Sequence, residues 1–208
     1  AVVLPSTIKT ISNVAFSNTY ISELILPEGL DSIGIMGLGS SSFKELVLPN
    51  SVKRLGKDAL SDNHKLKRVV LPKVLTEIPE GLCCMCRELE DAEIPANVRT
   101  VKREAFRYCE KLKVALPYGL ERIEALAFEH CLADSIVLPS TVKYLEGAPF
   151  RHVKGLKKIY YLAETPPVCT IDPQRFTDSI NPFDGSAPKD IPIYVPIGSA
   201  EKYRKAIG

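Results

Sequence analysis

Cysteine and histidine are the residue types in this sequence best suited to nucleophilic or metal chemistry. Of the six cysteines, Cys86, Cys109 and Cys131 each lie fifteen residues after a leucine or isoleucine that begins a repeated pattern. Cysteine outside a disulfide is among the most buried residue types. We therefore predict that these three cysteines are buried structural thiols, and that Cys83 is also a core residue.

A denser group of cysteines, at positions 83, 84 and 86, invites comparison with a metal site. Zinc sites usually combine Cys-x-x-Cys pairs with one another or with suitably spaced histidines. The sequence offers neither arrangement, so we predict no metal site and no cofactor. A disulfide within this group, or one that involves Cys169, stays an alternative in an oxidising compartment.

Two of the three histidines, His130 and His152, occupy the same position in successive copies of the pattern, as does Tyr108. Neighbouring histidines could bind a divalent metal or respond to mild acid. The neighbouring copies carry no carboxylate at this position, however, so we interpret it as a solvated edge. Neither the order nor the spacing of residues suggests a Ser-His-Asp or Cys-His pairing or a phosphate-binding loop. The sequence therefore predicts a protein that is not an enzyme.

The composition is that of an ordinary globular protein, with 45% hydrophobic and 25% charged residues. The 27 basic and 25 acidic side chains give a formal charge of +2 and form no basic run. We therefore expect no nucleic-acid partner, because such binding depends on neutralising several phosphates. No stretch approaches the roughly 20 apolar residues that span a bilayer, so we expect no membrane span.

A Leu-Pro or Ile-Pro pair recurs every 22 or 23 residues through most of the chain. The pairs begin at Leu4, Leu26, Leu48, Leu71, Ile94, Leu116 and Leu138. Large apolar residues recur four, seven and twelve positions after the first residue of each pair. One copy cannot bury such a face alone, so copies must stack on one another and share a continuous core. The period therefore predicts a solenoid.

Each copy ends in a short alternation of outward and inward residues, such as Glu45-Leu46-Val47-Leu48, directly before the proline. A period of two indicates a strand, and a proline just past the strand ends it and begins a turn. We therefore expect short parallel strands joined by turns, with little long helix.

One copy carries a recognisable signature, which reads Ile94-Pro95, Val98, Val101, Ala105-Phe106, Cys109 and Leu112. In this signature the chain resembles the BspA-like leucine-rich repeats of bacterial cell-surface proteins. The resemblance implies seven repeats of 22–23 residues over 1–162 and a C-terminal capping segment over 163–208 in the same domain, with a short helix after Ser199. The copies from Leu26 and Leu71 depart from the Ala-Phe signature. Because Ala1 stands inside a repeat, we expect further repeats before it.

The strand positions that face away from the predicted core form two columns. The first column is largely apolar and consists of Ile25, Val47, Val70, Glu93, Ala115, Val137 and Tyr160. The second changes from acidic to basic along the chain and consists of Glu23, Glu45, Arg68, Asp91, Lys113, Ser135 and Lys158. Exposed apolar stripes mark interaction sites, although β-branched residues also favour any strand surface. The candidate partner-binding residues are Val47, Val70, Val137, Tyr160, Arg68, Lys113 and Lys158.

The resemblance and the sheet columns together lead to one function and two alternatives. We expect a non-catalytic adhesion or interaction module, secreted or held at a cell surface, that binds a host matrix protein, a glycoprotein or a neighbouring cell. One alternative is a structural spacer that carries another domain outward from the cell surface. The other is an intracellular leucine-rich repeat scaffold or inhibitor.

Overall fold

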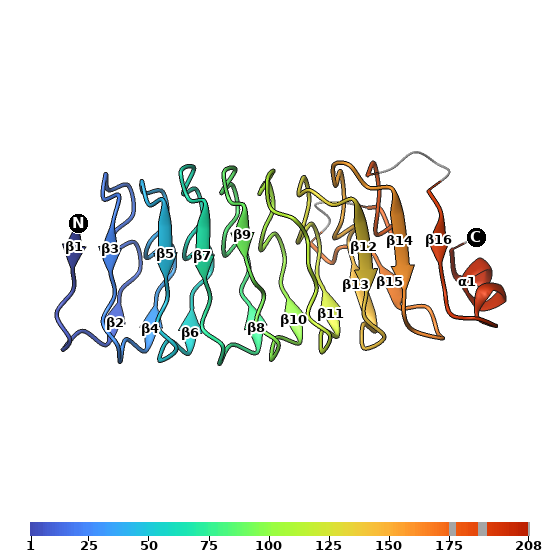
Figure 1. The fold of residues 1–208 in the computed structure, drawn as a ribbon, viewed down its shortest axis with the longest axis horizontal. Coiled ribbons are helices and arrows are strands. Elements are labelled where there is room, and N and C mark those ends of the chain that lie inside the picture. Colours follow the sequence, from blue (N-terminus) through green and yellow to red (C-terminus); the bar gives the residue numbers. More distant parts are fainter. Residues whose placement is uncertain (175–177, 187–190, 208) are drawn as a thin grey trace.

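The computed structural model describes residues 1–174, 178–186 and 191–207, and it shows a solenoid with two rows of short strands (Figure 1). The first row contains β1 (Val2–Val3), β3 (Leu24–Ile25), β5 (Glu45–Val47), β7 (Arg68–Val70), β9 (Asp91–Ala92), β12 (Ser135–Leu138), β14 (Lys158–Tyr161) and β16 (Ile193–Tyr194). The second row contains β2 (Thr10–Ile11), β4 (Ser32–Ile33), β6 (Arg54–Leu55), β8 (Glu77–Ile78), β10 (Thr100–Val101), β11 (Arg122–Ile123), β13 (Tyr144–Glu146) and β15 (Val168–Thr170). All paired strands are parallel, which confirms the predicted leucine-rich repeat solenoid of short strands and turns.

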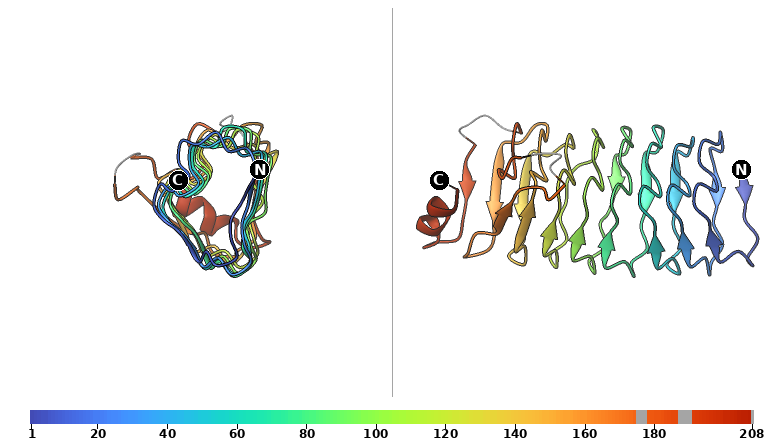
Figure 2. Two further views of the ribbon diagram at one scale, coloured as in Figure 1. Left: turned by 90° about the vertical axis from the view of Figure 1, so that its left-hand side faces the viewer. Right: turned by 180° about the vertical axis from the view of Figure 1, so that it is seen from behind.

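The second row of strands was missing from the sequence prediction, which placed strands only before the prolines. These strands lie around the inward residues seven positions after each Leu-Pro leucine, and they are two or three residues long. So short a segment shows no alternation that a pattern could reveal. Viewed along the axis, the two rows form two sides of each coil, and turns form the third (Figure 2).

A proline interrupts the hydrogen-bonded ladder of the second row between β6 and β8. After the preceding strands, the N–H of Gly34 donates to Ile11 and the N–H of Gly56 donates to Ile33, both at 2.8 Å. Pro79 occupies the corresponding position after β8 and has no N–H to donate to Leu55. The missing donor explains why the row divides at this point.

The turn side of the coils carries residues in the left-handed backbone region. The position fourteen residues after each Leu-Pro leucine has φ between 49° and 63° in all seven copies. These residues are Asn18, Ser40, Asp62, Met85, Tyr108, His130 and His152. Side chains other than glycine adopt this conformation at a cost, so the stacked neighbours must hold it in place.

The core is a continuous column of apolar side chains that runs the length of the solenoid. The three predicted inward columns are buried in nearly every coil, as expected. In the C-terminal half, Phe106, Phe128, Phe150 and Phe183 form a stack with ring centroids 5.1 to 5.6 Å apart. The aromatic column therefore continues beyond residue 162, into the segment that follows the last regular repeat.

That following segment adds a further, irregular coil to the solenoid. Strand β15 pairs with β13, and β16 pairs with β14. On the turn side, Pro182 and Asp184 accept backbone hydrogen bonds from Phe150 and His152, at 2.9 and 3.0 Å. Helix α1 (Ala200–Ile207) then lies at the C-terminal end, and its buried Tyr203 donates from its hydroxyl to the carbonyl of Ala163 at 2.9 Å.

A buried ion pair joins this irregular coil to a repeat three coils earlier. The guanidinium of Arg103 bonds to the carboxylate of Asp172, and the two side chains are 6% and 0% exposed. The two coils that separate Arg103 from Asp172 carry small residues, Ala125 and Gly147, at the repeat position that Arg103 occupies in its own coil. A Cβ at Gly147 would lie 2.7 Å from the Cβ atoms of both Ala125 and Asp172. Small residues at both positions therefore leave the room that the arginine side chain needs.

Candidate interaction surface

The face of the first strand row, here called the sheet face, carries the exposed apolar column that the sequence predicted. Ile25, Val47 and Val137 are 51%, 54% and 45% exposed, whereas Val70 and Tyr160 are partly buried. The strands alternate as expected, since the residue between the two outward columns is buried in β5, β7, β12 and β14. The sheet face is therefore a real exposed stripe, and its two halves differ in charge.

In the N-terminal half of the sheet face, the charges neutralise one another. Arg68 bonds to Glu45 on one side and, through its Nε at 2.9 Å, to Asp91 on the other. The hydrogen bond that Arg68 donates to Glu45, and then the one it donates to Asp91, raise the pKa of the Arg68 guanidinium. A groove of about 350 Å³ that includes Arg68 and Val70 is also lined by Asp91, Glu93 and Lys73. Arg68 thus already has two partners within the chain.

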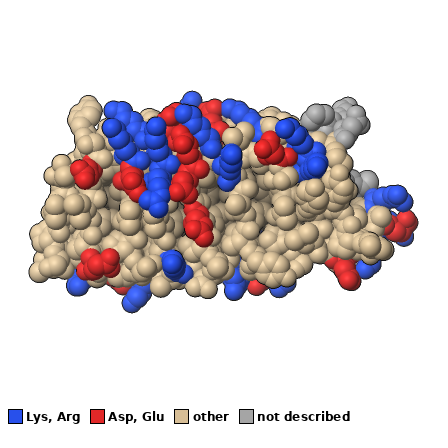
Figure 3. Space-filling view, in the orientation of Figure 1, with Lys and Arg blue, Asp and Glu red and all other residues tan. Residues whose placement is uncertain are grey.

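In the C-terminal half, the charged column behaves differently. Lys113 and Lys158 are exposed, and neither forms an ion pair within the described residues. The other lysines nearby are paired, as in Lys111 with Glu88 at 2.7 Å and Lys154 with Glu110 at 2.6 Å. Figure 3 shows that charged side chains gather along the upper edge of this face, whereas the area over β12, β14 and β16 is largely uncharged.

Lys113 does not lie on a ladder strand, which the sequence prediction had assumed. Its inward neighbours Leu112 and Val114 are two residues apart, whereas the corresponding residues of the next coil, Ala133 and Ile136, are three apart. This shortening shifts the segment out of register. Lys113 forms only an isolated bridge with Leu132, and the first row is interrupted between β9 and β12.

The interruption opens a groove that no sequence pattern had indicated. It has a volume of about 360 Å³ and is lined mainly by Ala115, Leu116, Tyr118, Val137, Pro139 and Leu162. Tyr118 is 72% exposed and Leu162 is 46% exposed, so apolar surface is available at its rim. Of the predicted site residues, the structure brings Val137 to this groove and leaves Val47 and Val70 on the other side of the interruption.

The apolar column continues past the last predicted residue. Tyr160 stacks on Tyr194 of β16, with ring centroids 4.7 Å apart and planes 15° apart. Tyr194 remains 45% exposed. The one signal for it in the sequence is the pair Val195-Pro196, which follows β16 as a proline follows most earlier first-row strands. We call Val137, Tyr160, Leu162 and Tyr194 the C-terminal patch.

The cysteines have structural roles in this arrangement. Cys86, Cys109 and Cys131 are fully buried, and their thiols donate to carbonyls of the preceding coil at 3.1 to 3.2 Å. Burial raises the pKa of Cys131, and it raises that of Cys84 to about 12. All six cysteines are free thiols, and the prediction that Cys83 and the three spaced cysteines are buried is confirmed.

The two neighbouring histidines lie in a stack of rings. Tyr108 and His130 lie 4.6 Å apart by ring centroids, and His130 and His152 lie 5.0 Å apart. Burial lowers the pKa of His130. Within the residues that the structure describes, no three His, Cys, Asp or Glu side chains gather where they could hold a metal ion. Among those same residues, no helix is long and apolar enough to cross a bilayer.

The sequence matches the family model described as BspA type leucine rich repeat region, in six copies, over residues 1–113 and 76–181. The chain belongs to this BspA-type leucine-rich repeat family. Leucine-rich repeat proteins of this family are generally not catalytic, and domains of this kind generally bind proteins. No curated protein matches the sequence.

Solved structures of bacterial leucine-rich repeat proteins share the fold. A protein from Bacteroides ovatus is 22% identical with a TM-score of 0.68, covering 84% of this chain and 57% of its own. One from Eubacterium ventriosum is 24% identical with a TM-score of 0.59, covering 67% of this chain and 39% of its own. The leucine-rich repeat protein of T. pallidum is 21% identical with a TM-score of 0.54, and the match covers 87% of this chain and 91% of that protein. This chain thus spans little more than half of the first protein and less than half of the second.

Proposed function

We propose that this chain is a non-catalytic interaction module that binds a protein or glycoprotein through the C-terminal half of its sheet face. The observation that carries the proposal is the C-terminal patch, an exposed and uncharged area beside a groove and two lysines that form no ion pair with any described residue. Contiguous apolar exposure marks interaction sites, and solenoids bind along such extended faces.

We further propose that the module acts outside a bacterial cell, secreted or held at the surface, where host matrix proteins and mucosal glycoproteins are available partners. The support for this is the resemblance to BspA-like proteins. The buried thiols do not oppose it, because each of the three spaced cysteines is fully enclosed and donates to a carbonyl. A thiol held in this way is protected from oxidising reagents by lack of access.

The test is capture of partners from mucosal and extracellular-matrix extract by four matched proteins, with the captured proteins identified by mass spectrometry. The variant Val137→Ser with Tyr160→Ala changes the C-terminal patch, and Val47→Ser with Val70→Ser changes the N-terminal half. The control changes Tyr144→Ser and Val168→Ser, which are 40% and 54% exposed on the second strand row.

We expect the parent, the control and the N-terminal-half variant to capture the same partner, and the C-terminal-patch variant to lose it while keeping the parental circular dichroism spectrum. Equal capture by all four proteins would contradict the proposed surface. If none captures a partner, the spacer function moves ahead. One observation favours that second candidate: the coils stack into a straight, continuous tube that could hold another domain at a distance (Figure 1).

A further inference from the structure

The groove beside the C-terminal patch has an apolar floor with unpaired backbone groups at its edge. Within the part of the chain that the structure describes, no backbone hydrogen bond joins Ala115 or Leu116 to β9 or to β12. In some other coils the corresponding residues pair across the first row, as Leu4 does with Ile25 at 3.1 Å and Leu48 does with Val70 at 3.0 Å, although this row also divides between β3 and β5. Ala115 is exposed, so these groups bond to water or to an incoming chain. Unpaired strand edges are the places where extended peptides add to sheets.

The charge around the groove is positive on the side of the second outward column. Lys158 is in register with Ser135, which lines the groove, and Lys113 directly precedes the groove residue Val114 and is in register with Leu132. Asp134 already pairs with Lys157 at 3.5 Å and does not neutralise them. Two carboxylates of a partner could therefore meet two unused ammonium groups.

From this combination we infer that the partner presents an extended acidic segment to the groove. The inference rests on the proposed function and specifies its ligand. An apolar or aromatic side chain of the segment occupies the groove between Ala115 and Val137, and its backbone bonds to the unpaired groups of Ala115 and Leu116. Carboxylates on the same segment pair with Lys113 and Lys158, which selects acidic segments over basic ones.

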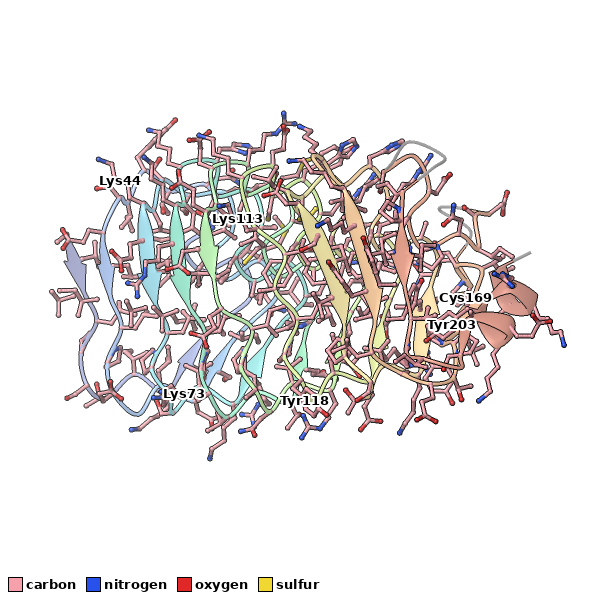
Figure 4. All side chains as sticks on the ribbon, turned by 45° about the vertical axis from the view of Figure 1, so that its right-hand side comes forward. Lys44, Lys73, Lys113, Tyr118, Cys169 and Tyr203 are labelled. Atoms are coloured by element: carbon pink, nitrogen blue, oxygen red, sulfur yellow. The ribbon has the colours of Figure 1, made fainter. Side chains whose placement is uncertain are left out.

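The test is selection of binding peptides from a displayed library of random linear sequences against the intact chain. The enriched peptides are then synthesised, and their affinities are measured by fluorescence anisotropy for the parent and two charge-reversal variants. The test variant is Lys113→Glu with Lys158→Glu. The control is Lys44→Glu with Lys73→Glu, which makes the same change in net charge at two exposed lysines, also without ion pairs among the described residues, away from the groove (Figure 4).

We expect the enriched peptides to combine acidic residues with an apolar or aromatic residue. We expect the test variant to bind them about tenfold more weakly than the parent and the control variant to bind within about twofold, because exposed ion pairs contribute modestly and act locally. Enriched peptides without acidic residues, failure to enrich any peptide, or equal weakening by both variants would overturn the inference. The capture experiment separates this inference from the proposed function. If the C-terminal-patch variant loses the captured partner but Lys113→Glu with Lys158→Glu keeps it, the proposed surface is supported and the inference of an acidic segment is refuted.

Discussion

Replacement of Arg103 by methionine should destabilise the C-terminal half of the solenoid. Arg103 and Asp172 form an ion pair whose side chains are 6% and 0% exposed, so water screens it little. The change removes the guanidinium charge that faces Asp172, although the carboxylate keeps the hydrogen bond from the N–H of Gln174 at 3.0 Å. Removing one partner of a buried pair typically costs about 3 to 5 kcal/mol, and we expect a loss in the free energy of unfolding of this size.

A second variant separates the cost of a buried charge from the general effect of changing a buried side chain. Replacing both residues, as Arg103→Met with Asp172→Leu, removes the charge together with its partner, and such apolar replacements are often close to neutral. We therefore expect the double variant to recover most of the stability that the single variant loses. The difference in unfolding free energy between them measures the cost of keeping the Asp172 carboxylate buried once the guanidinium is gone.

Urea denaturation followed by circular dichroism gives both values, from the midpoint and the slope of each transition. Circular dichroism suits this chain because it contains no tryptophan. The buried pair does not hold the irregular coil as described if the unfolding free energy of Arg103→Met is within about 1 kcal/mol of the parental value. The same conclusion follows if the double variant is as unstable as the single one.

Three further predictions concern the core, the stacked histidines and the thiols. Phe128→Ala should lower the free energy of unfolding by about 3 to 5 kcal/mol in the same urea assay, because Phe128 is 1% exposed and stacks on two rings; a loss near that of an exposed position would contradict this. Because the folded pKa of His130 lies below its ordinary value of 6.5, the unfolded chain binds more protons, and stability should be full above that value and fall as the pH drops below it. Thermal melts of the parent and of His130→Gln check this, and the same acid sensitivity in both would refute it. With a thiol reagent, the native chain should react first at Cys169, the most exposed of the six cysteines, and the buried thiols should react only after unfolding. Rapid labelling of Cys109 in the native chain would contradict their burial.

Much of the fold is predictable from the sequence because each repeat has its inward-facing residues at the same fixed positions. Leu30, Ile33 and Leu38 are fully or almost fully buried, and the residues at the same three repeat positions are buried in nearly every other coil. A proline after most first-row strands indicated where those strands end. The rest of the chain follows no such period, which is why the irregular coil could be placed only once β15 and β16 were seen to pair with β13 and β14.

The candidate surface was predicted in outline, but its details depend on contacts between coils. The outward columns are periodic, so their exposure follows from the alternation. The neutralisation of Arg68 by Glu45 and Asp91 could have been suspected, because all three share one column. The groove depends on a spacing between Leu112 and Val114 that is one residue short, and the pair of Arg103 with Asp172 spans 69 residues. Neither leaves a repeated pattern in the sequence.

Amide hydrogen exchange of the intact chain, with and without its captured partner, tests most directly whether the C-terminal half of the sheet face is the binding surface. Bound partner should slow exchange in the groove segment at 113–118, in β12 and in β14, and should leave the second strand row unchanged. Protection confined to the second row, or to the N-terminal strands β3, β5 and β7, would contradict the proposed surface.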